Sequence, residues 1–214
     1  MFKGIRERKA LEDRVKREGR LPPGQSLTTK FPVLHYGPTP QLNLEKWDLR
    51  IFGAVENEVR WDWEQFNQLP QTRVVMDIHC VTRWSKFDTE WKGVHLRTLV
   101  EQGILKLKPE ARFVVQHCEH GFTTNIPVEL ALADNFLLAT HLDGAPIARE
   151  HGYPLRCVVG AIPGRSDLHE PYFWKGGKWL RALEFRAEDH LGFWEQAGYH
   201  NDADVWKEQR FSYG

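Results

Sequence analysis

The sequence predicts a single α+β domain, a β-rich mixed sheet accompanied by short helices. Short apolar segments recur along the chain and are bounded by Gly and Pro, as strands are. The helical patterns between them are brief. Strands and helices also follow one another without the regular alternation of βαβ units, so a mixed sheet is favoured over a doubly wound parallel sheet.

The chain is expected to begin with an arm at residues 1–25, followed by one domain at residues 26–214. Residues 3–20 mix basic and acidic side chains and predict a solvated helix that docks through a few apolar side chains. The Pro- and Gly-containing stretch after it ends the helix. Residues 30–40 are rich in proline, so we expect extended backbone there.

The next stretch predicts two strands and a helix. Residues 47–52 alternate apolar and polar side chains, as a half-buried strand does, and residues 59–61 are the expected partner strand. Asp62 is expected to cap a short helix at residues 63–69, which Pro70 ends.

The middle of the chain is organised around Val74–Trp84 (VVMDIHCVTRW). Its apolar residues predict a buried strand that ends at His79–Cys80 and leads into a polar turn. Trp91–Val94 is expected to form a second turn. Residues 96–102 predict a short helix ended by Gly103.

A second strand also ends in a His–Cys pair. Residues 111–117 predict this strand, which His117–Cys118 closes. Residues 121–127 are expected to form a loop, residues 128–133 a helix and residues 136–141 a strand.

The last part of the chain predicts one more strand. Residues 160–177, rich in Gly, Pro and aromatic side chains, are expected to form a loop before a strand at residues 178–185. Residues 192–210 are mostly polar, and we expect their aromatic side chains to anchor this tail to the domain. These anchors are Phe193, Trp194, Tyr199 and Trp206.

Composition narrows the classes of function. The formal net charge is zero, which predicts no nucleic-acid partner because phosphate binding needs an excess of Lys and Arg. No stretch is apolar enough to predict a membrane span. Cys80, Cys118 and Cys157 form an odd, widely spaced set, which indicates a reducing compartment. With no visible export signal, we expect a cytoplasmic protein.

Cys80 is the strongest candidate for chemistry. Its position at the end of a strand lets the scaffold hold the sulfur rigidly. A thiolate is a soft ligand, suited to metals that accept soft donors. Polar Thr82, Arg83 and Ser85 surround it in sequence, and a nearby cation favours the thiolate form. We therefore expect Cys80 to bind a metal.

Two other chemistries remain open for the same residues. The first is a zinc site, although adjacent residues of a strand point to opposite faces and no CxxC or HxxxH spacing is present. Its ligands would come from His79, Cys80, His117, Cys118 and His120. The second is a Cys–His hydrolase, because ten histidines offer partners, but no hydrolase signature flanks Cys80.

Two later segments predict a grip for an anion. His151–Arg156 (HGYPLR) is stiff and ends in a guanidinium. Gly176-Gly177-Lys178 places backbone N–H groups and an ammonium just before a strand. Together they predict a phosphate or oxyanion site. Without a P-loop or a GxGxxG motif, a nucleotide is not indicated.

These features together resemble the molybdopterin-dependent oxidoreductases of the sulfite oxidase family, in their small stand-alone form. The likeness follows the chain in order over most of its length. It is carried by DIHCVTRWS (77–85), WKGV (91–94), GFTTNIP (121–127), HGYPLR (151–156), KWLRALEF (178–185) and GFWEQAGYH (192–200).

The resemblance implies the family's molybdopterin-binding fold and a molybdenum-molybdopterin cofactor (Mo-MPT). Molybdenum would be held by the dithiolene, oxo groups and one cysteine sulfur, here Cys80. His151 and Arg156 match the segment that contacts the pterin or its phosphate, and the 176–178 segment matches the loop at the phosphate end. The cofactor-binding residues so implied are His35, Tyr36, Cys80, His117, His151, Arg156, Gly176, Gly177 and Lys178.

The activity implied is oxygen-atom transfer to or from a small sulfite- or sulfoxide-like substrate, with electrons passing to a separate electron-transfer protein. Arg83, with Lys86 or His117, would stabilise charge on this oxo-acceptor or oxo-donor. The chain departs from sulfite oxidases proper at Val33–His35, where those enzymes carry an arginine close to the metal. The rival interpretation is a non-catalytic molybdopterin-binding or partner-binding module. Retention of Cys80 disfavours it, because storage would not require a metal thiolate.

Overall fold

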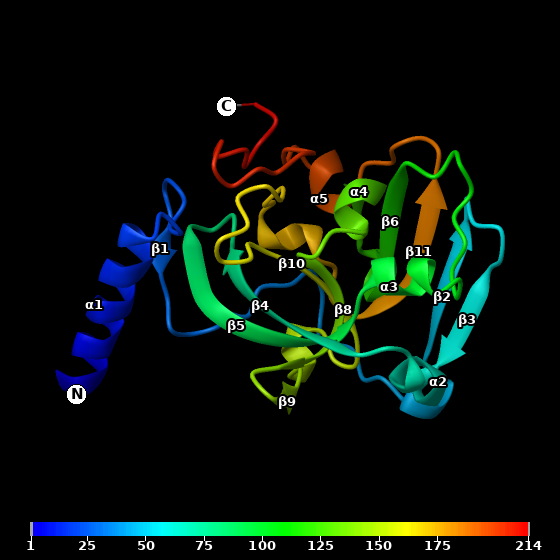
Figure 1. The fold of residues 1–214 in the computed structure, drawn as a ribbon, viewed down its shortest axis with the longest axis horizontal. Coiled ribbons are helices and arrows are strands. Elements are labelled where there is room, and N and C mark those ends of the chain that lie inside the picture. The colour runs from blue at the N-terminus through cyan, green and yellow to red at the C-terminus, as the bar shows by residue number, and fades with distance from the viewer. Residues whose placement is uncertain (1, 214) are drawn as a thin grey trace.

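The computed structural model describes residues 2–213, whose strands divide between two sheets (Figure 1). The helices are α1 (Phe2–Arg17), α2 (Trp63–Gln68), α3 (Leu96–Glu101), α4 (Val128–Ala131) and α5 (Phe193–Gln196). The strands are β1 (Ser26–Leu27), β2 (Asp48–Gly53), β3 (Val59–Asp62), β4 (Thr72–His79), β5 (Trp84–Val94), β6 (Phe113–Cys118), β7 (Thr123–Pro127), β8 (Phe136–Leu142), β9 (Ala145–Pro146), β10 (Arg156–Val159) and β11 (Leu180–Arg186).

Both sheets mix parallel and antiparallel pairs. The first runs β1-β5-β8-β10, with β4 paired to β5 and β9 to β8. In it β1 is parallel to β5 and the other pairs are antiparallel. The second runs β3-β2-β11-β6-β7, with β11 parallel to β2. The predicted mixed, strand-rich α+β fold with short helices is confirmed, but the strands form two sheets rather than the one expected.

The main apolar core lies between the two sheets and under α2, α3 and α4. Leu138 of β8 faces this core, whereas its neighbour Leu137 packs in a second cluster on the opposite face of the same strand. This alternation is the period of two that a strand imposes. Because both faces of β8 are buried along its first part, residues 136–139 (FLLA) form a continuous apolar run rather than an alternating one.

Several predicted elements are confirmed at nearly the expected bounds. Asp62 caps α2 through a capping box with Gln65: its carboxylate accepts from the Gln65 N–H, and the Gln65 side chain accepts from the Asp62 N–H. The predicted strand before Cys80 is β4, which ends at His79.

One predicted turn and most of one predicted loop are wrong. Trp91–Val94 lies inside β5, not in a turn, and a Cβ at Gly93 would overlap the carbonyl oxygen of Leu138. Gly93 therefore permits close approach of β8 rather than chain reversal. Residues 123–127 of the expected 121–127 loop form β7, because they pair with β6. The two strands are consecutive in the chain and form a hairpin.

The N-terminal arm packs against the first sheet. Val15 of α1 is fully buried with Leu27 and Phe87. Just beyond α1, the Arg20 guanidinium donates to both carboxylate oxygens of Asp77 in β4, at 2.8 and 2.7 Å. None of the helices within residues 2–213 has the length and hydropathy needed to cross a membrane.

Candidate active site

A cavity of about 300 Å³ opens beside Cys80. Four segments that are distant in sequence line it: residues 31–36, the Cys80 turn, residues 173–179 and the start of the C-terminal segment. Arg156 of β10 also contributes. The cavity therefore brings together the Cys80 turn and the two segments predicted to grip an anion.

The Cys80 turn connects β4 to β5. The Cys80 N–H donates to the carbonyl of Trp84 at 2.8 Å, and the Arg83 N–H donates to the carbonyl of Cys80 at 3.0 Å. Arg83 adopts a φ of 73°, in the left-handed region that non-glycine residues seldom occupy. The turn is thus held tightly by its own backbone.

The Cys80 sulfur faces the cavity and lies 3.2 Å from the hydroxyl oxygen of Thr82. Burial raises the pKa of this thiol, while the Thr82 hydrogen bond and the positive charges of Arg210 and Lys178 oppose the rise. Without a metal the sulfur is therefore held as a thiol at neutral pH. A metal that binds it must displace the proton.

The residues of the two alternative chemistries are not gathered. His79 is buried, and its Nδ1 lies 2.8 Å from the Ser85 hydroxyl. Across residues 2–213, the group of three side chains placed to share a metal ion is His169, Asp202 and Asp204, which contains none of the five zinc candidates. The Cys80 sulfur contacts the hydroxyl of Thr82. A Cys–His hydrolase would instead need a histidine within hydrogen-bond distance of the sulfur.

Arg156 is a buried cation held by neutral acceptors. Its guanidinium donates to the carbonyls of Cys157, His151 and Gly176 at 3.1, 2.9 and 3.1 Å. Burial lowers its pKa to about 9. Within the described chain no carboxylate pairs with it. Because a buried charge without a counter-ion costs several kcal/mol, an anionic group in the cavity would relieve this cost.

Lys178 is the second cation of the cavity. Its ammonium donates to the carbonyls of Leu34 and Glu150 at 2.7 and 2.9 Å. Burial and the charge of Arg156 lower its pKa to about 7, while the Glu150 carboxylate opposes the shift. Two cations that repel one another in one cavity are an arrangement suited to a multiply charged anion.

His151 lies behind the cavity wall. Its ring stacks on Phe31, which lines the cavity, with centroids 3.8 Å apart and planes 5° apart. Its Nδ1 is buried and has no hydrogen-bond partner within residues 2–213. Burial, with Lys178 and Arg156, lowers its pKa to about 4, so the ring is neutral. A neutral imidazole with an unused nitrogen can still accept or donate one hydrogen bond.

Gly176 and Gly177 serve packing. The N–H of Gly177 donates to the Gln116 side chain at 2.7 Å, and the N–H of Gly176 donates to the Phe173 carbonyl at 3.2 Å. A Cβ at Gly177 would lie 2.5 Å from the Cys118 sulfur. The expectation that both N–H groups are available to a phosphate is therefore not met. Gly176 lines the cavity, but with its amide already bonded.

The remaining predicted residues divide between the cavity and the outer surface. His35 and Tyr36 line the cavity, where Tyr36 packs on Phe193 with ring centroids 4.5 Å apart. His117 lies in β6 outside the cavity lining, and its Nε2 is 2.9 Å from the Glu184 carboxylate. Arg83 is exposed on the solvent side of the turn.

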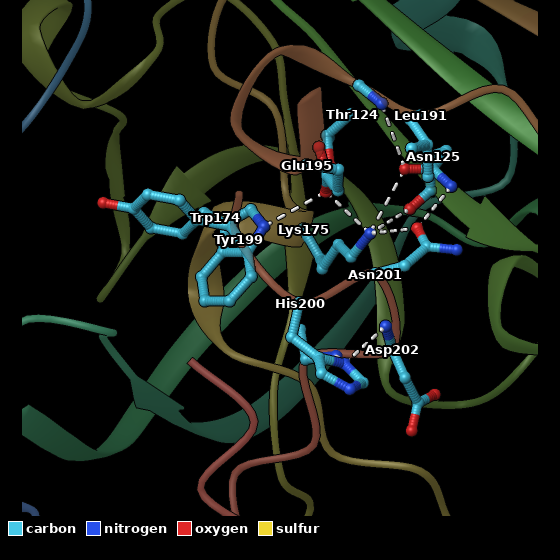
Figure 2. Close-up of polar contacts among 12 residues, drawn as sticks. Thr124, Asn125, Trp174, Lys175, Leu191, Glu195, Tyr199, His200, Asn201 and Asp202 are labelled. Atoms are coloured by element: carbon cyan, nitrogen blue, oxygen red, sulfur yellow. Dashed lines mark hydrogen bonds and ion pairs between the residues drawn. The ribbon is translucent and has the colours of Figure 1, made fainter. Parts of the chain in front are cut away.

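The sequence interpretation did not identify which residues form the aromatic wall of the cavity. Trp174, Trp194 and Tyr199 line it, although the last two were expected only as anchors. Behind this wall, the Lys175 ammonium lies 2.6 Å from the Glu195 carboxylate, and both side chains are buried (Figure 2). The Trp174 Nε1–H donates to the same carboxylate at 3.1 Å, so this ion pair orients the wall. The available signal was the density of Trp and Tyr in this tail.

Comparison with known proteins identifies the family of the chain. The family model described as oxidoreductase molybdopterin binding domain matches residues 36–194. An uncharacterized oxidoreductase of Bacillus subtilis (strain 168), YuiH, is 42% identical over 196 residues, 91% of this chain and 93% of that protein. The sulfite oxidase of Arabidopsis thaliana is 25% identical over 199 residues, 77% of this chain and 48% of that protein.

A solved structure has a similar fold. The sulfane dehydrogenase SoxCD from Paracoccus pantotrophus matches with a TM-score of 0.60 and 21% sequence identity, over 72% of this chain and 41% of that chain. At this identity the likeness concerns the fold alone.

Proposed function

This chain belongs to the molybdopterin-binding oxidoreductases of the sulfite oxidase family, and on that premise we propose that it transfers an oxygen atom to or from a small substrate with Cys80 as the protein ligand of molybdenum. The observation that carries this proposal is the cavity itself. A cysteine sulfur faces the same space as the buried Arg156 and the partly buried Lys178, two cations that lack carboxylate partners within residues 2–213.

The side chains present fit such a cofactor. Arg156 and Lys178 supply positive charge for a phosphate tail. The neutral His151 ring supports Phe31 of the cavity wall from behind. The aromatic wall excludes water, which strengthens each electrostatic contact in the cavity. When bound, the molybdenum cofactor supplies the two-electron redox change and the oxo group.

In this proposal the residues divide the work. Cys80, at the end of β4, would hold the metal through its deprotonated sulfur. Lys178, from the 176–178 segment, stabilises negative charge inside the cavity. Its positive charge acts on the Cys80 sulfur, where it lowers the pKa of the thiol. Arg83 is exposed, so it acts by attracting an anionic substrate toward the entrance of the cavity. Electrons pass to a separate protein at the surface.

Metal and pterin analysis tests the proposal. Protein produced in a host that makes the cofactor should carry molybdenum and pterin together. Cys80→Ser should abolish turnover with artificial electron acceptors or donors but retain pterin, because Arg156 and Lys178 still hold the tail. Cys118→Ala, which removes a buried thiol outside the cavity, is the control. It should retain both pterin and turnover.

Three results would contradict the proposal. Wild-type protein without molybdenum or pterin would remove its basis. Turnover that persists in Cys80→Ser would exclude the sulfur as a required ligand, and a pterin-loaded wild type without any oxygen-transfer activity would favour the non-catalytic binding module.

A further inference from the structure

The Cys80 turn is contacted by two segments from opposite ends of the described chain. One is the loop before β1, and the other is the C-terminal segment around residue 210. They meet at Gly24, which has a φ of +65°. A Cβ there would overlap the Glu208 carboxylate and lie 2.9 Å from Arg83 Nη1 and 3.1 Å from Arg210 Nη2. A side chain at position 24 would therefore require the ends of these three side chains to move.

From the first segment, Gln25 reaches the turn. Its Nε2 donates to the carbonyl of Cys80 at 3.0 Å, and its side chain is buried. The same carbonyl accepts the Arg83 N–H, so both of its acceptor positions are used. The backbone of this segment is fixed by the next residue, since the Ser26 N–H donates to the Arg83 carbonyl at 2.9 Å.

From the other segment, Arg210 reaches the next peptide group. Its Nη1 donates to the carbonyl of Val81 at 2.6 Å. The guanidinium packs over the ring of Tyr172, 4.7 Å from the ring centroid. This is a charge-assisted hydrogen bond from a buried side chain, which is stronger than a neutral one.

Together the two bonds fix consecutive peptide planes, Cys80–Val81 and Val81–Thr82. The first of these planes contains the Cα of Cys80, and the plane on its other side is held by the bond from the Cys80 N–H to the Trp84 carbonyl, so the direction of the Cα–Cβ bond is restrained. The second plane holds the next residue of the turn in place. Each of these two side chains also has a buried polar atom without a hydrogen-bond partner within residues 2–213. These atoms are Oε1 of Gln25 and Nε of Arg210. Such atoms cost stability. The arrangement therefore restrains the turn at some expense to the free energy of folding.

We propose that Gln25 and Arg210 are positioning residues that hold the Cys80 turn so that its sulfur faces the cavity in readiness for a metal. This inference rests on the proposed function for the identity of the metal. The restraint itself is a property of the protein before any cofactor binds.

Amide hydrogen exchange in the cofactor-free protein tests the restraint. Gln25→Leu and Arg210→Met should each speed the exchange of the Cys80 and Arg83 amides about tenfold or more, the factor that 1.4 kcal/mol represents. Exchange in β6 should stay unchanged. The matched controls are Gln71→Leu and Arg181→Met, which also remove side-chain bonds to backbone carbonyls, but far from Cys80. They should leave the turn protected.

A second measurement uses protein loaded with cofactor. Gln25→Leu and Arg210→Met should both keep pterin but show weaker thiolate-to-molybdenum charge-transfer absorption than the wild type. Arg210→Lys, which keeps the charge, should show an absorption between those of Arg210→Met and the wild type. Unchanged exchange of the turn amides in both variants would overturn the inference. So would exchange that rises equally in β6, because the two residues would then support the whole domain. A wild type that never binds molybdenum would count against the proposed function and leave the exchange result standing.

Discussion

The Lys178 ammonium donates to the carbonyl of Leu34 at 2.7 Å, across 144 residues of sequence. This bond joins the strand-entry loop after Gly177 to the proline-rich loop that carries His35 and Tyr36. One lysine therefore does two things. It closes one side of the cavity, and it places a positive charge inside it.

Replacing Lys178 with Met should weaken cofactor retention. A hydrogen bond to a charged group contributes about 1.5 to 3 kcal/mol, so we expect pterin to dissociate roughly 10- to 100-fold more readily. The measurement is pterin content after dialysis. Lys46→Met, which changes a lysine outside the cavity lining, is the control. Equal retention in the wild type and in Lys178→Met would exclude this lysine from the anion grip.

Anion binding to the cofactor-free cavity should depend on pH near neutrality. The pKa of Lys178 is lowered to about 7, below its ordinary value. Below pH 7 the ammonium is charged and attracts an anion, and as pH rises through 7 the charge and the attraction are lost. Sulfate, which does not titrate in this range, is a suitable probe for calorimetry. Its affinity should fall above pH 7 in the wild type and lose this dependence in Lys178→Met.

The same pKa shift affects stability with the opposite sense. Between pH 7 and the pKa of the unfolded lysine, the unfolded chain holds a proton that the folded chain has released. The free energy of unfolding should therefore rise with pH across this window as far as Lys178 contributes. The difference between wild type and Lys178→Met, followed by urea unfolding from pH 6.5 to 9, isolates this contribution.

Arg83→Ala should leave kcat unchanged, because Arg83 is exposed on the solvent side of the turn. For an anionic substrate, kcat/KM should fall a few-fold at low ionic strength and recover in salt, since screening removes long-range attraction. Steady-state kinetics at two salt concentrations check this. A salt-independent loss of kcat would instead place Arg83 at the reacting atoms.

The free energy of unfolding should depend strongly on the buried ion pair of Lys175 and Glu195. Breaking a buried ion pair by removing one partner costs about 3 to 5 kcal/mol, and we expect this for Lys175→Met and for Glu195→Leu. Urea unfolding measures it. The double variant should recover part of the loss, because no charge is then left buried alone. A loss in the double variant equal to the sum of the two single losses would contradict the pairing.

The sequence by itself determined the local elements whose signals are local. Alternation predicted β2, and Asp62 predicted the start of α2 because a carboxylate bonds the N–H groups of the first helical turn. The apolar run that stops at His79–Cys80 predicted the end of β4. The motifs around Cys80 and in residues 151–156 were specific enough to indicate the family to which the chain belongs.

Only the tertiary structure decided which of the marked residues share a cavity. It brought Cys80, Arg156 and Lys178 together, left His117 and Arg83 outside the lining, and used the amides of Gly176 and Gly177 for packing. It also placed residues 91–94 (WKGV) within β5 and paired Lys175 with Glu195 behind the aromatic wall. The physical reason is that strand pairing, close approach at glycine and burial of a charge all depend on neighbours that are distant in sequence. No local pattern encodes which neighbour that will be.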